Sequence, residues 1–204
     1  MKKLTFIIAL MLMSIAGIAQ DEAKTSPKIG IRFGYNLSNI DEFWELKDDY
    51  KDWKSGINLG VVSDLSLTQK IIFRPGLYYS MKGTKFLDDT KHRYNYLEAP
   101  LLMVFQQPVG EKVKLELQVG VYLGVGICGK REYPAFQEGD KSYKEDTFGG
   151  SNGEKRFDCG LNIGCGLNIG KYYLGASFED GFCSYGSNNS DKTHCLMINA
   201  GYIF

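Results

Sequence analysis

The segment VKLELQVGVYLGVGI, residues 113–127, decides how this chain folds. Its odd-numbered positions are all Val, Leu or Ile, whereas its even-numbered positions hold three glycines, a tyrosine, a glutamine and a Lys/Glu pair. Successive side chains of a β-strand point to opposite faces, so the segment has one wholly apolar face. In a membrane barrel such a face meets lipid, and the other face meets a polar, crowded lumen. We therefore predict a membrane-spanning strand.

The same alternation recurs along the rest of the chain, and no run of about 18 apolar residues follows the N-terminal one, which excludes a helical membrane protein. The other alternating segments are residues 29–40, 54–67, 71–83, 94–107, 157–169, 172–182 and a last one that ends at Phe204. Together with 113–127 they predict an all-β protein, an eight-stranded antiparallel up-and-down transmembrane β-barrel with a filled polar lumen.

The N-terminus predicts export. Lys2 and Lys3 precede an apolar run, and Gly17-Ile18-Ala19 follows it as a small-x-small cleavage site, which is the pattern of a secretory signal peptide. We assign residues 1–19 to the signal peptide, 20–28 to a periplasmic N-terminal segment and 29–204 to the outer-membrane barrel domain. Lys+Arg 24 balance Asp+Glu 24, so the charge gives no reason to expect nucleic acid as a partner.

The connections between the expected strands alternate between short and long. The short ones fall near residues 68–69, 108–111 and 170–171, and the long polar ones at 41–53, 84–93, 129–156 and 183–194. Outer-membrane barrels have short periplasmic turns and long outer loops. We therefore expect both termini in the periplasm and the long loops outside the cell.

An eight-stranded lumen is just wide enough to be filled by its own side chains, which disfavours a diffusion pore. The inward positions carry charges of both signs, which must pair or meet water. This lumenal charge network comprises Arg32, Asp64, Arg74, Lys82, Glu98, Lys114, Glu116, Asp158 and Glu179. A structural set of ion pairs is the main interpretation, and a proton or ion path is the alternative. Asp64 should lie across the second turn from Arg74, and we predict that pair.

The sequence predicts no cofactor and no metal site. Gly124-x-Gly126-x-x-Gly129 fits the dinucleotide fingerprint, but that motif requires a turn from strand to helix, and here the glycines lie inside a strand. The acidic pairs of the outer loops lack the spacing of a calcium loop.

Five cysteines are many for such a barrel. Cys183 and Cys195 flank one hairpin with the same inward parity, so we predict a disulfide between them if the compartment oxidises thiols. Cys128 and Cys159 fall on opposite faces by alternation, so their pairing would require a bulge. The alternative is that all five are small space-filling residues.

An enzyme is the first alternative function, because some eight-stranded outer-membrane barrels modify lipid A with a His/Ser/acid set near the outer leaflet. His92 and His194 are expected at the outer rim, and the second lies near serines and an acid. These neighbours are Ser184, Ser187, Ser190 and Asp191. No nucleophile motif surrounds them, and such loops are serine-rich for turn chemistry alone. We expect no enzymatic activity and assign no catalytic residue.

The outer loops are the leading candidates for interaction, because aromatic residues stand there among charges. They are Phe43, Trp44, Tyr50, Trp53, Tyr133, Phe136, Tyr143 and Phe148. The same residues also suit an aromatic belt at the membrane surface. We expect a non-enzymatic protein with a structural role or a surface-interaction role toward an unknown ligand. A soluble periplasmic barrel that binds an apolar ligand is the second alternative.

Four stretches also resemble a known family. They are GIRFGYNLS at 30–38, PGLYYSMKG at 75–83, YLEAP at 96–100 and GYIF at 201–204, and they are similar to the small outer-membrane β-barrel proteins of Bacteroidota, the PorT-like family. The resemblance implies an outer-membrane location among lipid and lipopolysaccharide. Tyr202-x-Phe204 is similar to the signal by which the barrel assembly machinery recognises its clients. The family has no agreed catalytic motif, so the resemblance implies no activity.

Overall fold

The computed structural model describes residues 26–41, 51–86, 90–134, 143–148, 155–183 and 192–204. Their secondary structure consists of nine strands. These are β1 (Lys28–Asp41), β2 (Lys51–Ser66), β3 (Ile71–Phe86), β4 (Lys91–Pro108), β5 (Val113–Tyr133), β6 (Tyr143–Asp146), β7 (Phe157–Ile169), β8 (Tyr172–Gly181) and β9 (Lys192–Ile203). Within these ranges there is no helix long and apolar enough to cross a membrane.

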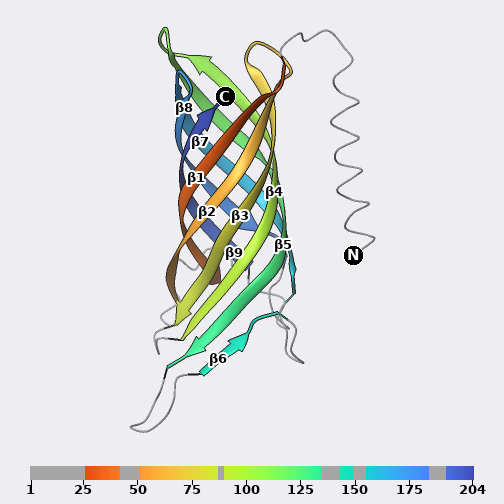
Figure 1. Cartoon of the computed structure of the whole chain (residues 1–204), viewed down its shortest axis with the longest axis vertical. Coiled ribbons are helices and arrows are strands. Elements are labelled where there is room, and N and C mark those ends of the chain that lie inside the picture. Colours follow the sequence, from red (N-terminus) through yellow and green to blue (C-terminus); the bar gives the residue numbers. More distant parts are fainter. Residues whose placement is uncertain (1–25, 42–50, 87–89, 135–142, 149–154, 184–191) are drawn as a thin grey trace.

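The strands close into a barrel (Figure 1). The sheet runs in the order β4-β3-β2-β1-β9-β8-β7-β5-β6, and an additional pairing of β4 with β5 joins its two sides. All the pairings are antiparallel, and the first and last strands of the chain are neighbours. The closed ring therefore has eight strands, and β6 is a short ninth strand on the outer edge of β5. The predicted fold class is confirmed.

The barrel is apolar outside and polar inside. On β5, Leu117 and Val119 are 57% and 44% exposed, whereas the intervening Glu116 and Gln118 are 0% and 5% exposed. This inversion of the usual pattern is what a barrel needs when lipid surrounds it. The strand alternation read from the sequence therefore assigned the two faces of β5 correctly.

The two ends of the barrel differ, and we call them the turn end and the loop end. The turns from β2 to β3, β4 to β5 and β7 to β8, together with the start of β1 and the end of β9, lie at the turn end (Figure 1). Gly170 has φ +62° in the turn between β7 and β8, a conformation that L side chains rarely adopt. At the loop end, β5 and β6 project beyond the other strands.

A bulge changes the alternation of β5 near the loop end. Asn95 pairs with Cys128 but its neighbour Tyr96 pairs with Gly126, which leaves Ile127 as the extra residue. Ile127 and Cys128 are therefore both exposed, and Gly129 beyond them is buried. The inward position that simple alternation gives Cys128 is wrong for this reason.

Candidate functional site in the lumen and at its ends

Arg74 on β3 is the centre of the first lumenal cluster. Its Nε lies 2.5 Å from Asp64 Oδ1 and its Nη1 lies 2.7 Å from Glu116 Oε2. The guanidinium binds each carboxylate with a second nitrogen-to-oxygen contact as well, at 2.8 Å and 3.0 Å. Arg74 is 0% exposed, and two facing carboxylates compensate for the loss of water around its charge.

Amides complete this Arg74 cluster. Gln106 Nε2 donates to Glu116 Oε1 at 2.5 Å, and Asn168 Nδ2 donates to the same oxygen. Sequence reasoning named the three charges and the Asp64–Arg74 pair, and the structure contains that pair. The two amides were missed, although Asn168 has inward parity in the expected strand.

Arg32 lies deeper in the lumen and uses an aromatic ring instead of a carboxylate. Its Cζ lies 3.6 Å from the centre of the Tyr173 ring, and Arg74 Cζ lies 5.8 Å from the same centre. A cation over an aromatic face is attracted by the ring quadrupole. Both arginines are therefore within reach of the Tyr173 ring, and Arg32 is the closer of the two.

Lys82, also on β3, is the centre of the second cluster, nearer the loop end. Its Nζ lies 2.5 Å from Glu98 Oε1 and 2.7 Å from Glu179 Oε2. It also lies 4.5 Å from the centre of the Tyr122 ring, whose hydroxyl donates to Asp158 Oδ2 at 3.1 Å. These charged side chains are 1–3% exposed. The Lys82 cluster joins β3, β4, β5, β7 and β8 across the lumen.

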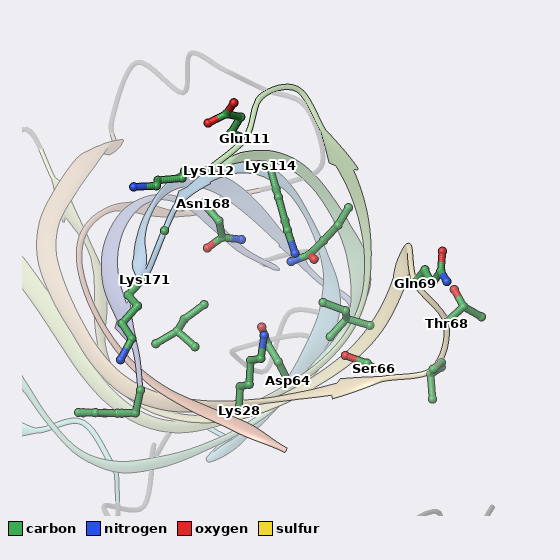
Figure 2. A pocket seen from close by; sticks show the side chains of 16 residues that line it. Lys28, Asp64, Ser66, Thr68, Gln69, Glu111, Lys112, Lys114, Asn168 and Lys171 are labelled. Atoms are coloured by element: carbon green, nitrogen blue, oxygen red, sulfur yellow. The ribbon is translucent and has the colours of Figure 1, made fainter. Parts of the chain in front are cut away.

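The last residue of the expected network, Lys114, lies elsewhere. It is exposed and lines an open vestibule of about 760 Å³ at the turn end, and Figure 2 shows Lys28, Lys112 and Lys171 in the same lining. Lys114 thus keeps the lumenal side that the sequence predicts, but it lies at the open mouth, where its charge meets water. None of these four ammonium groups has a carboxylate of the described residues within ion-pair distance.

The vestibule does not continue through the barrel, because the Arg74 cluster closes its inner end. Asp64, Gln106 and Asn168, which belong to the Arg74 cluster, form part of its lining. Beyond that cluster lies a cavity of about 30 Å³ among Arg32, Tyr78 and other lumenal side chains, which is enough for about one water molecule. The turn end is thus open to solvent but is separated from the loop end by packed side chains.

Phe148 covers the lumen at the loop end. It is 7% exposed and packs with Ile40, Tyr94 and Tyr96. Arg156 fixes it, because its Nη2 donates to the Phe148 carbonyl at 3.3 Å and its Cζ lies 5.1 Å from the ring centre. The expectation that Phe148 is exposed in an outer loop is wrong, because the chain after β6 folds back onto the barrel mouth. Phe136, Phe43, Trp44 and Tyr50 lie outside the described residues, as does the side chain of Tyr143.

A histidine–carboxylate pair lies on the outer face near the loop end. His194 Nδ1 is 2.8 Å from Asp180 Oδ1, and the Phe178 ring stacks on the imidazole at 6.3 Å between centroids. His194 Nε2 is buried and has no hydrogen-bond partner. Ser184, Ser187, Ser190 and Asp191 fall outside the described residues, and His92 contacts Tyr94 instead, at 3.1 Å.

The predicted Cys183–Cys195 disulfide is wrong for this structure. All five cysteines are free, Cys195 is fully buried in the lumen, and Cys183 Sγ lies 3.1 Å from the Sγ of Cys159. Strand β8 ends at Gly181, so strand parity no longer determines where Cys183 points. The assignment failed because it extended the alternation past the end of the strand.

The C-terminal aromatic residues lie at the turn end. The Tyr202 ring packs edge-on against Tyr172 and Phe204, at 5.5 Å and 5.4 Å between centroids. The Phe204 backbone nitrogen donates to the Ile29 carbonyl at 2.8 Å, and its side chain is 65% exposed. No group of three or more His, Cys, Asp or Glu side chains in the described ranges is arranged to hold a metal ion.

Comparisons with known proteins agree with this geometry. The outer membrane protein beta-barrel domain family matches residues 18–185. Among solved structures, Neisserial surface protein A is 9% identical over 88% of this chain and 100% of that chain, with a TM-score of 0.51. Ail of Yersinia pestis is 18% identical over the same shares with a TM-score of 0.45. The outer membrane enzyme PagL is 9% identical over 83% and 97%, with a TM-score of 0.47.

The likeness to Neisserial surface protein A, at 9% identity, shows the fold alone. A search of curated protein sequences found no significant match.

Replacing Arg74 with Ala should lower the free energy of unfolding by about 3–5 kcal/mol, because it leaves two buried carboxylates without their cation. Urea unfolding of the refolded barrel, followed by tyrosine and tryptophan fluorescence, measures the effect. Lys114→Ala, which removes an exposed lysine, should change stability by no more than about 0.5 kcal/mol. Combining Arg74→Met with Asp64→Asn and Glu116→Gln should recover much of the loss; equal instability of the single and triple variants would contradict the ion-pair explanation.

The packed lumen predicts that the protein does not conduct ions. In planar lipid bilayers, purified protein should give no stable conductance steps under conditions in which a large porin does. Phe148→Ala should behave in the same way, because the Arg74 and Lys82 clusters still fill the lumen. Reproducible open-channel steps from the unmodified protein would show that the clusters leave a continuous path.

Proposed function

Because the chain belongs to the outer membrane protein beta-barrel domain family, we propose that it is a non-enzymatic outer-membrane protein that binds the anionic glycolipid of the cell surface through its loop end. The observation that carries this proposal is a group of basic side chains on the strand extension. In this proposal the turn end faces the periplasm, the loop end lies outside the cell, and residues 1–19 are removed on export. We also propose that the chain belongs to the PorT-like group of these barrels, which its sequence resembles.

The basic side chains come from three cross-strand rows. One row joins Lys85, Lys91, Glu132 and Lys144, the next joins Thr84, His92, Arg131 and Glu145, and the third joins Gly83, Arg93, Lys130 and Asp146. The first and third rows share the outer face, whereas the middle row has the opposite parity and its Thr84 is 2% exposed. The two outward rows hold five lysine and arginine residues against Asp146 and Glu132, and Lys144 binds Glu132 at 3.0 Å. Asp52 of β2 lies opposite Lys85 and adds one further carboxylate to the first row. The balance leaves a net positive surface.

In this proposal the rows lie at the level of the glycolipid head groups. Just nearer the turn end, the outward residues Leu97 and Tyr79 are exposed apolar side chains and pair with each other across β4 and β3. The apolar band gives way to the basic rows within a few residues. Lysine and arginine at the edge of a lipid-facing band bind phosphate and carboxylate groups of the adjacent leaflet. A phosphorylated glycolipid such as lipopolysaccharide supplies these groups at that level.

The filled lumen favours a function at the ends of the barrel over one in its interior. The Arg74 and Lys82 clusters occupy the interior and Phe148 covers the mouth, so the accessible chemistry lies at the ends of the barrel. An aromatic pair at the other end, Tyr202 and Phe204, fits the proposed recognition by the barrel assembly machinery. The vestibule lysines provide a second basic surface of similar charge, which serves as an internal control.

Glycolipid retention tests the proposal. The variant Lys91→Glu, Arg93→Glu, Lys130→Glu changes three exposed residues of the rows and should weaken binding by about 3 kcal/mol, at about 1 kcal/mol for each basic residue. The measurement is the amount of phosphorylated glycolipid that copurifies with the barrel after transfer to a neutral detergent. The matched control, Lys112→Glu, Lys114→Glu, Lys171→Glu, makes the same charge change at the turn end and should retain the glycolipid. Equal retention by the two variants would contradict the proposal.

Lipid modification is a second candidate, and the His194–Asp180 pair favours it. In catalytic triads a carboxylate holds one imidazole nitrogen so that the other can activate a hydroxyl group. His194 has part of this arrangement, because its Nδ1 lies 2.8 Å from Asp180 Oδ1 on the outer face of the barrel, while its Nε2 is buried without a hydrogen-bond partner. A serine nucleophile would come from residues 184–191.

Mass spectrometry of lipid A separates the two candidates. On the main proposal, cells with the gene, without it, and with His194→Ala have the same acyl-chain pattern. An acyl difference that depends on the gene and disappears in both His194→Ala and Asp180→Asn would establish the enzyme instead. Phe178→Leu, which keeps both polar groups, is the control for local packing.

A further inference from the structure

We propose that Cys159 and Cys183 form a disulfide at the loop end of the barrel. Their sulfur atoms lie 3.1 Å apart, and both thiols are half-buried. A disulfide has a sulfur–sulfur distance of about 2.0 Å, so closure needs a movement of about 1 Å. This inference is independent of glycolipid binding and needs only that the protein is exported to a compartment that oxidises thiols.

The backbone between β7 and β8 already holds the two residues together. Gly160 pairs with Gly181, and the Phe182 nitrogen donates to the Cys159 carbonyl at 2.7 Å. That hydrogen bond is one residue past the end of β8. Cys183 follows directly, so its side chain meets the outward-facing Cys159 without a change in strand register.

The other three cysteines are in different environments. Cys195 lies in the lumen and is 0% exposed. Cys165 is on the outer face farther along β7, where it pairs with Ala176 of β8. Cys128 belongs to β5 and pairs with Asn95 of β4. Asn95 Nδ2 donates to Cys128 Sγ at 3.2 Å. Among the five cysteines, only Cys159 and Cys183, whose sulfur atoms lie 3.1 Å apart, have the geometry for a disulfide.

Thiol–disulfide exchange accounts for the oxidation. The thiolate of one cysteine attacks the disulfide of a thiol oxidoreductase and forms a mixed disulfide, and the second thiolate then displaces the donor. The sulfur–sulfur bond of the donor breaks, that between Cys159 and Cys183 forms, and the donor leaves as a dithiol with two electrons and two protons. The partial exposure of both thiols gives the donor access.

The bond would reinforce the loop end of the β7–β8 pairing. Strand β8 ends at Gly181, and the next strand, β9, begins at Lys192. A covalent link at Cys183 anchors the point from which this connection departs. It also restricts the unfolded chain, which is the usual source of stabilisation by a disulfide.

Peptide mapping tests the pairing. Full-length protein is isolated from outer membranes after the free thiols have been alkylated in place, and it is digested with trypsin without reduction. Cleavage after Arg156, Lys171 and Lys192 puts Cys159 and Cys183 on different peptides. We expect peptide 157–171 linked to peptide 172–192, and release of the link by a reductant.

Serine variants decide which sulfurs are joined, because Cys165 shares a peptide with Cys159. Cys165→Ser should keep the linked peptide, and Cys159→Ser should abolish it; the reverse result would overturn the assignment. A link from 172–192 to 193–204 would restore the Cys183–Cys195 pair and overturn it as well. Alkylation of both Cys159 and Cys183 in situ would show that the bond does not form in the exported protein.

Folding of the variants is checked by the mobility of unheated samples in SDS. The unmodified protein and Cys165→Ser should stay in the compact form to a higher temperature before reduction than after it. Cys159→Ser should show no such dependence on the reductant. A dependence that persists in Cys159→Ser would mean that another bond is responsible.

Discussion

The need to neutralise charge inside a narrow lumen determines the rest of this structure. Eight strands enclose a space that side chains fill, and in that space an unpaired charge is costly. The chain meets this constraint with two cations on one strand, Arg74 and Lys82 of β3, each bound by two carboxylates. Strand β3 is thereby connected with β2, β4, β5 and β8, including strands that are not its neighbours in the sheet. The clusters act as cross-links through the middle of the barrel.

Filling the lumen in this way moves the accessible chemistry to the surface. The vestibule at the turn end is open but blind, and Phe148 covers the loop end. Outside the lipid-facing band, β5 and β6 carry the sheet onward with its basic rows (Figure 1). In the proposed function the barrel serves as a rigid support, and glycolipid binds where the strands leave the bilayer.

The proposed activities depend on different parts of the loop end. The basic rows lie on β3 to β6, whereas the His194–Asp180 pair and the two thiols lie on β7 to β9. Glycolipid binding needs only net positive charge at the correct height, which tolerates variation in individual residues. A disulfide needs two particular sulfurs within reach, so it requires the exact course of the chain after β8.

The sequence by itself determined the fold class, the two faces of most strands and the identity of the buried charges, because strand alternation is a local property of period two. It also determined the Asp64–Arg74 pair, since a tight turn sets the register of the two strands beside it. Only the tertiary structure decided how Lys82 meets Glu179, 97 residues away, how Phe148 returns to the mouth, and that Cys183 faces Cys159. These contacts depend on barrel closure, a bulge and chain paths beyond the strand ends. Periodicity places Lys82 and Glu179 on the lumenal face, but it does not say which side chains meet there.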